Sequence, residues 1–449
     1  MFVQSNRVKR ALCAVMALGI ALGPWSGAMA GQIDQGNFGR NAVGGVQIDA
    51  KGVLTTNPAT VNKRVLEIRR KLITNAPAEL NGSIPLRKIS LRRLQEALAK
   101  HYRQVPAPPL ADELRFLGGL QRVKYILVYP EDNDIVLVGP GEGWKVAEDG
   151  NVVGVTTGRP VLLLDDLLVA LRTARPTRGG ALTCSIDPTP EGVKNFAAFF
   201  RNQARNNKNR RKLSTRFIEA AEQAMGPQTI TLKGVPKNTH FARVMVTADY
   251  QMKRLAMGFE KSPVKGMPEY LSLIKSGKVN NAMPRWWMST NYKSLLRDKA
   301  GLTWKLRGPG VKVLSSDSAP AKKWAENMTA KYDDLAEKMP VFAQLRNCMD
   351  LAVIGALIFK EDLPGKAGMR LDYLLNEREL PYVERFNSPR QVATHVRAVH
   401  RSRGWLINAS GGVEIMPWSV VAHSEVDAAI SSVHKKAANR EKVSTWWRN

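Results

Sequence analysis

The pattern that most restricts the fold is a pair of apolar segments, Val123–Tyr129 and Ile135–Val138, separated by a short polar stretch. That stretch, Pro130-Glu-Asp-Asn-Asp134, combines proline with carboxylate and amide side chains, which favour tight turns. Two strand-like segments on either side of such a turn predict an antiparallel β-hairpin. Because the Asp149-Gly150 turn and a third strand-like segment at 152–156 follow, we expect a small antiparallel sheet here.

Helical patterns alternate irregularly with these strands. Ser90 precedes leucines at positions 91, 94 and 98, which predicts a capped amphipathic helix to about Tyr102. Asp165 or Asp166 is positioned to cap a second helix. Further helices are predicted over residues 167–174, 188–206, 215–225 and 342–359, whereas 241–255 fits either a helix or a strand. Helices and antiparallel strands out of strict alternation indicate an α+β fold.

The chain changes character after residue 318. Before that point, Leu302–Leu306 and Val311–Leu314 flank Gly308-Pro-Gly310, and we expect them to pair as a second hairpin. After it, apolar residues recur mainly at helical spacing. We therefore expect an α+β region over residues 31–318, and a mainly helical region over 319–449 that packs on it or forms a separate subdomain.

The N-terminus has the organisation of a secretory signal peptide. Three basic residues precede the apolar run Ala11–Leu22, which is shorter than the roughly 20 residues that a membrane-spanning helix needs. Ala28 and Ala30 place small side chains where signal peptidase requires them. We expect residues 1–30 to be removed by cleavage between Ala30 and Gly31, and the protein to work in the periplasm or outside the cell.

The chain is strongly basic. Its 67 lysines and arginines exceed its 39 acids by 28 charges, and removal of residues 1–30, with three basic residues and no acid, leaves +25. A dense basic run favours a polyanion such as an acidic polysaccharide, an anionic lipid surface or nucleic acid. The alternative is a solvated loop between two helices, because no aromatic side chains are interleaved. The densest run has no acid and contains Arg201, Arg205, Lys208, Arg210, Arg211, Lys212 and Arg216.

Two cysteines, Cys184 and Cys348, remain beyond the predicted signal peptide. An oxidising compartment would allow them to form a disulfide. The alternative is two buried thiols, because free cysteine packs as a small hydrophobic residue. A hydrolase would be a second possible function, with a site that combines Cys184 with the distant residues Asp187, Asp249 and Lys253.

We predict no cofactor and no metal site. Gly139-Pro-Gly-Glu-Gly143 follows a strand, as a phosphate-binding loop would, but a strand rather than a helix is expected next. Glu142 also places an acid where the anion would bind. The six histidines include no pair at i, i+4 spacing, which excludes the common helical zinc motif. The apolar segment Leu351–Phe359 is too short to span a membrane.

Several separated segments together resemble an uncharacterised family of large exported proteins from planctomycete bacteria. These segments are 118–125, 128–136, 143–146, 183–192 and 248–258. The resemblance covers most of residues 40–420 and implies an exported protein that evolved as a single unit. It assigns no activity and no catalytic residues. The leading hypothesis is therefore a non-catalytic, structural or binding protein whose basic surface contacts an anionic envelope or extracellular component.

Overall fold

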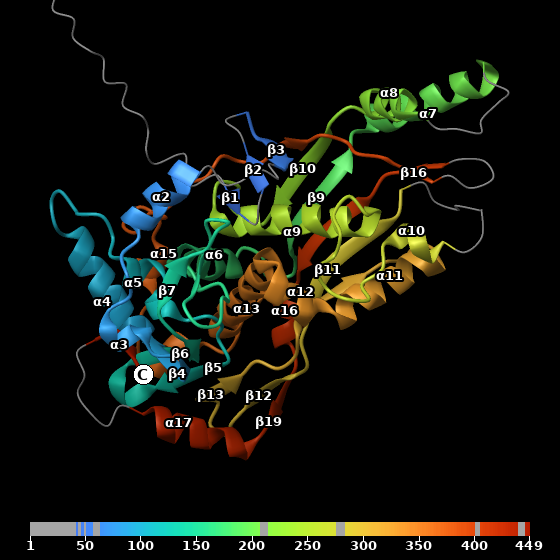
Figure 1. Cartoon of the computed structure of the whole chain (residues 1–449). Coiled ribbons are helices and arrows are strands. Elements are labelled where there is room, and N and C mark those ends of the chain that lie inside the picture. The colour runs from blue at the N-terminus through green and yellow to red at the C-terminus, as the bar shows by residue number, and fades with distance from the viewer. Residues whose placement is uncertain are drawn as a thin grey trace, which may run out of the picture. The chain divides into compact units, whose positions relative to one another are not determined.

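The chain forms two mixed β-sheets with helices packed against them (Figure 1). We describe a computed structural model. The residues that it describes are 42–43, 46–48, 51–56, 63–206, 214–274, 283–399, 405–438 and 445–449. The predicted signal peptide, with its cleavage site at Ala30 and Gly31, lies outside these residues.

The larger sheet has nine strands within the described ranges. The β3–β15 and β11–β18 pairs are parallel, and the other neighbours are antiparallel. In spatial order its strands are β1 (Ala42–Val43), β2 (Val46–Ile48), β3 (Val53–Thr56), β15 (Gln391–Val392), β10 (Gln228–Lys233), β9 (Leu182–Pro188), β18 (Ser410–Ile415), β11 (Arg285–Asn291) and β14 (Gly310–Leu314).

The smaller sheet contains the hairpin predicted over 123–138. Tyr125 pairs with Val138 and Tyr129 with Asp134, which confirms the hairpin. In spatial order its strands are β19 (Ser424–Val426), β12 (Leu295–Arg297), β13 (Thr303–Lys305), β5 (Tyr125–Tyr129), β6 (Asp134–Gly141), β4 (Ile84–Ser90) and β20 (Trp447–Arg448). Two separate ribbons are β7 (Trp144–Val146) with β8 (Val152–Gly154), and β16 (Arg397–Val399) with β17 (Trp405–Ile407).

The helices confirm the α+β class. Those before residue 318 are α2 (Lys63–Leu72), α3 (Ala78–Asn81), α4 (Leu91–Tyr102), α5 (Asp112–Arg115), α6 (Leu164–Ala174), α7 (Pro190–Asn206), α8 (Thr215–Met225), α9 (His240–Met257) and α10 (Tyr270–Leu273). Those after it are α11 (Ala319–Ala330), α12 (Tyr332–Lys338), α13 (Pro340–Lys360), α14 (Leu363–Ala367), α15 (Asp372–Leu375), α16 (Pro417–Val421) and α17 (Ser431–Ala437). Helices dominate residues 319–375, whereas strands and short helices share residues 391–448.

Three helices form the centre of the hydrophobic core. α9 packs on β9 and β18 of the larger sheet, and α13 packs on both α9 and α6. Figure 1 shows α6 and α13 beneath α9 in that view. Among the described residues, α13 alone is long and apolar enough to cross a membrane, but almost all of it is buried within the protein. Its apolar character is therefore that of a core helix.

One predicted pairing is wrong. The segments Leu302–Leu306 and Val311–Leu314 do not pair with each other across Gly308-Pro-Gly310. Instead β13 pairs with β5 and β12 of the smaller sheet, whereas β14 pairs with β11 of the larger sheet. The glycine-rich turn thus carries the chain from one sheet to the other. Each strand pairs where it buries its apolar face, and turn residues alone do not decide that.

Strands from both sides of residue 318 contribute to both sheets. β15 and β18 lie between strands of residues 31–318 in the larger sheet, and β19 and β20 form the two edges of the smaller sheet. The described residues all belong to one compact unit, residues 36–449.

Candidate polyanion-binding hairpin and buried polar clusters

The two helices that flank the basic run pack against each other as a hairpin, α7–α8. Four phenylalanines hold it together. Phe196 and Phe200 lie with ring centroids 4.9 Å apart, and Phe217 of α8 lies 5.2 Å from Phe199 and 5.9 Å from Phe200. Figure 1 shows α7 and α8 side by side. The apolar spacing that predicts the two helices thus also provides their contact surface.

Charge is distributed unevenly along this hairpin. Its acids are Glu191 in the first turn of α7, and Glu219 and Glu222 in α8, so the stretch from Arg201 to Arg216 contains none. Arg201 and Arg216 lie nearer the connection and are exposed. Arg205 belongs to α7. The remaining predicted residues, Lys208, Arg210, Arg211 and Lys212, lie outside the described residues.

The opposite end of the hairpin is anchored to the segment between β15 and β16. Glu222 Oε1 accepts a hydrogen bond from Val396 N at 2.9 Å, and the carbonyl of Gly226 accepts one from Thr394 Oγ1 at 2.6 Å. Val396 is buried in the phenylalanine cluster. At the start of α8, Ser214 Oγ accepts from Phe217 N and caps the helix. The hairpin is therefore hydrogen-bonded to the 393–396 segment at one end, and the sequence that connects its two helices at the other end is rich in lysine and arginine.

The four residues of the hydrolase hypothesis lie in one region between α9 and the larger sheet. Cys184 and Asp249 have no exposed surface, and Lys253 is also buried. Asp187 is half-buried. Lys253 Nζ donates to Asp249 Oδ2 at 2.9 Å, to the carbonyl of Ile186 at 2.9 Å and to that of Gly411 at 3.2 Å. All three ammonium protons are thus engaged, and the pair joins α9 to β9 and β18.

Burial governs the electrostatics of this cluster. It raises the pKa of Asp249 to about 7, although Lys253 acts in the opposite direction. Burial also raises the pKa of the Cys184 thiol well above its usual value. A nucleophilic cysteine needs a lowered pKa and access to substrate. The geometry is therefore that of a buried structural ion pair. The 241–255 segment, which fits either a helix or a strand in the sequence, lies within α9, where Asp249 and Lys253 are one turn apart.

Both cysteines are free and buried. Cys184 lies in β9, whereas Cys348 lies in α13, where burial raises its thiol pKa as well. Of the two alternatives that the sequence leaves open, the structure therefore contains two buried thiols.

The glycine-rich segment around Glu142 is stabilised internally. Glu142 is fully buried and accepts hydrogen bonds from Thr157 N at 2.9 Å, Thr156 N at 3.2 Å and Gln121 Nε2 at 2.7 Å. Burial alone would raise its pKa, but the hydrogen bonds from these three residues outweigh it and hold the pKa below the usual value. Within the glycine-rich segment, the amides of Glu142 and Gly143 donate to the carbonyls of Gly119 and Asn81.

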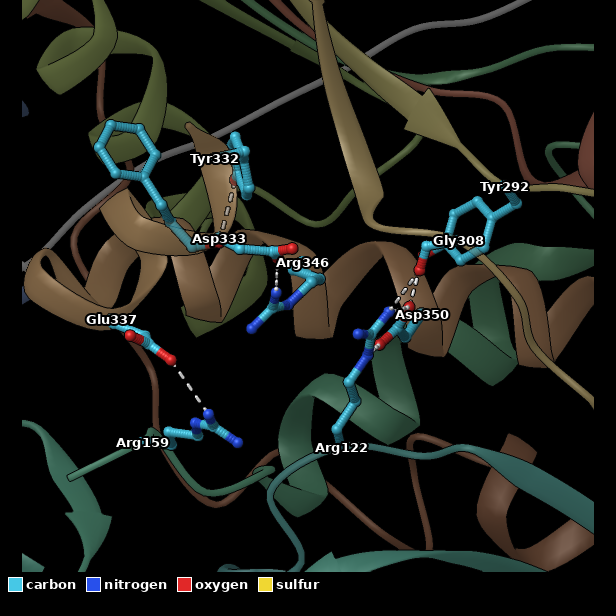
Figure 2. A network of polar contacts seen from close by, with 10 residues as sticks. Arg122, Arg159, Tyr292, Gly308, Tyr332, Asp333, Glu337, Arg346 and Asp350 are labelled. Carbon is cyan, nitrogen blue, oxygen red and sulfur yellow. Dashed lines mark hydrogen bonds and ion pairs between the residues drawn. The ribbon is translucent and has the colours of Figure 1, made fainter. Parts of the chain in front are cut away.

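A third polar cluster connects the two sheets through α13. Figure 2 shows Arg122 and Tyr292 reaching Asp350 from two different segments. Arg122 Nε donates to Asp350 Oδ2 at 2.6 Å, and Tyr292 OH donates to Oδ1 at 2.6 Å. Burial would lower the pKa of Arg122, but Asp350 outweighs it and raises that pKa. The only sequence signal for this cluster is an aspartate inside an apolar helix.

Comparison with known protein families finds a match for only part of this α+β protein. Residues 184–270 match the family described as a protein of unknown function, DUF1598. Comparison with curated proteins and with solved structures finds no match. The matched segment runs from β9 to the start of α10, so it contains the hairpin, Asp249 and Lys253. It includes the resembling segment 248–258 and most of 183–192, and it assigns no activity.

Proposed function

We propose that this chain is an exported binding protein that holds an anionic polymer of the envelope or extracellular space through the connection between α7 and α8. The observation that carries the proposal is the anchored hairpin, which places exposed Arg201 and Arg216 at the ends of a run without acids. When a polyanion binds to a cluster of positive charges, the counterions condensed on the polyanion are released, and this release favours association. The cluster at Cys184 supports no hydrolase proposal, because its nucleophile is buried.

The test of binding uses the full chain and dextran sulfate as the probe. Replacing Arg210, Arg211 and Lys212 with Glu is expected to weaken binding at least tenfold and to make its salt dependence less steep, because fewer counterions are released from the polymer. The matched control replaces Lys299, Lys322 and Lys435 with Glu, which changes the net charge equally at exposed positions of other elements. Equal weakening by both variants, or none by the first, contradicts the proposal.

Two further measurements define the partner and the location. Single-stranded DNA in the same assay identifies nucleic acid as the partner if it binds more tightly than dextran sulfate at equal salt. For export, the chain is expressed in a bacterium and cell fractions are analysed. The expected product is exported and begins at Gly31. A cytoplasmic product that retains residues 1–30 contradicts export.

A further inference from the structure

A histidine–aspartate pair lies outside the clusters described above. His240 is the first residue of α9, and its Nδ1 lies 2.9 Å from Oδ2 and 3.1 Å from Oδ1 of Asp166 in the first turn of α6. Both side chains are less than a tenth exposed. A carboxylate only accepts hydrogen bonds, so Nδ1 carries the proton that it donates to Asp166. Nε2 of the neutral ring is then an acceptor.

His240 lines a cavity of about 30 Å³. A cavity needs at least about 10–15 Å³ to hold a water molecule, so this one is large enough for water. The cavity lies near the surface, because three of its lining residues are only half-buried, among them Arg69 and Glu384. Segments distant in sequence meet here: the other lining residues are Phe116, Asn151, Val152, Val161, Leu163, Gln344 and Phe386.

Gln344 of α13 provides a second acceptor in this cavity. Its side chain is 8% exposed, and its Oε1 is buried without a hydrogen-bond partner among the described residues. The orientation of its amide follows from its neighbours. Asn151 Nδ2 donates to Asp149 Oδ2 at 2.6 Å, so Asn151 Oδ1 is left to accept from Gln344 Nε2 at 3.2 Å. A buried carbonyl oxygen without a donor is unfavourable, and a ligand that donates to it would remove that cost.

We propose that this cavity binds a water molecule that donates to Nε2 of His240 and to Oε1 of Gln344. The two acceptors require a ligand with two donors, and the volume fits water. Asp166 accepts from Nδ1, which fixes the ring orientation and the tautomer in which Nε2 is free to accept.

The proposal is independent of polymer binding by the hairpin, and its test needs no substrate. Nitrogen NMR of the full chain, labelled at histidine, reports which ring nitrogen carries the proton. At a pH where His240 is neutral, the expected form has protonated Nδ1 and unprotonated Nε2. A high-resolution crystal structure is expected to show one water within hydrogen-bond distance of both acceptors. A ring protonated at Nε2, or a cavity without water, overturns the proposal.

Two variants separate binding of the water from orientation of the ring. Gln344→Leu is expected to lose the water while the His240–Asp166 pair remains, whereas Gln104→Leu, at an exposed position, changes neither. Asp166→Asn is expected to shift the proton toward Nε2, because the amide can donate to Nδ1. Retention of the water in Gln344→Leu, or of the Nδ1 proton in Asp166→Asn, contradicts the assigned roles. If either variant does not fold, the two measurements on the unaltered chain still decide the proposal.

Discussion

Lys253 Nζ lies 2.9 Å from Asp249 Oδ2, one turn earlier in α9, and also donates to backbone carbonyls of β9 and β18. One ammonium group therefore connects the central helix to two neighbouring strands that are far apart in sequence. Both side chains of this pair lie within the segment that matches the family of unknown function, residues 184–270.

Replacing Lys253 with methionine is expected to lower the free energy of unfolding by about 3–5 kcal/mol at pH 8, because Asp249 would stay buried without its partner, either as an unpaired charge or after binding a proton. Urea denaturation followed by circular dichroism measures the change. The control is Lys233→Met, an exposed position of β10, which should shift the midpoint little. Equal stability of Lys253→Met and the unaltered chain would show that the pair contributes nothing.

Gly412 of β18 is expected to tolerate no side chain. A Cβ atom there would overlap the carbonyl oxygen of Cys184 and lie 2.8 Å from Cζ3 of Trp287. Gly412→Ala should therefore lower the melting temperature, with a cost of about 1–3 kcal/mol or more for overpacking. Gly82→Ala is the control, because nothing lies within 4 Å of its Cβ position. Similar melting temperatures for both variants would contradict the close strand approach.

Asp165 makes stability depend on pH. Burial raises its pKa from 3.8 to about 7, although the amides of Glu384 and Val383 donate to it. Between these values the folded state binds more protons than the unfolded state, so this contribution to stability falls as pH rises. Relative to Asp165→Asn, the unaltered chain should lose up to about 1.4 kcal/mol for each unit of pKa shift.

Urea denaturation of both proteins between pH 4 and pH 8 measures this loss. Asp132→Asn, at an exposed position, is the control and should give a difference that is nearly independent of pH. If the free energy of unfolding of the unaltered chain, minus that of Asp165→Asn, stays constant or rises with pH, the raised pKa is contradicted.

The thiols of Cys184 and Cys348 should resist modification in the folded protein. Both are buried, and burial raises both pKa values, which reduces the thiolate that alkylating reagents need. Iodoacetamide followed by peptide mass spectrometry is expected to label neither cysteine without denaturant and both in urea. Labelling of either in the folded chain, or a disulfide-linked peptide containing both, would contradict the structure.

Much of the helical structure is predictable because its signals are local. Ser90 Oγ accepts from Arg93 N, so the predicted cap begins α4, and the helix predicted over 215–225 is observed as α8. The predicted cap of α6 is different. α6 begins at Leu164 without a side-chain cap, and Asp165 and Asp166 instead bind residues distant in sequence. A residue type that suits a cap serves equally well as a buried acceptor.

The sequence by itself determined the basic run, the amphipathic helices and the first hairpin, because charge density, periodicity and turn chemistry depend on neighbouring residues. Only the tertiary structure decided that β13 and β14 join different sheets, that Lys253 reaches β18, and that Asp166 orients His240. These interactions include a hydrogen bond between residues 158 positions apart. They depend on which apolar faces the whole chain buries together. The free energy of that burial is a property of the complete fold, so no local sequence pattern predicts it.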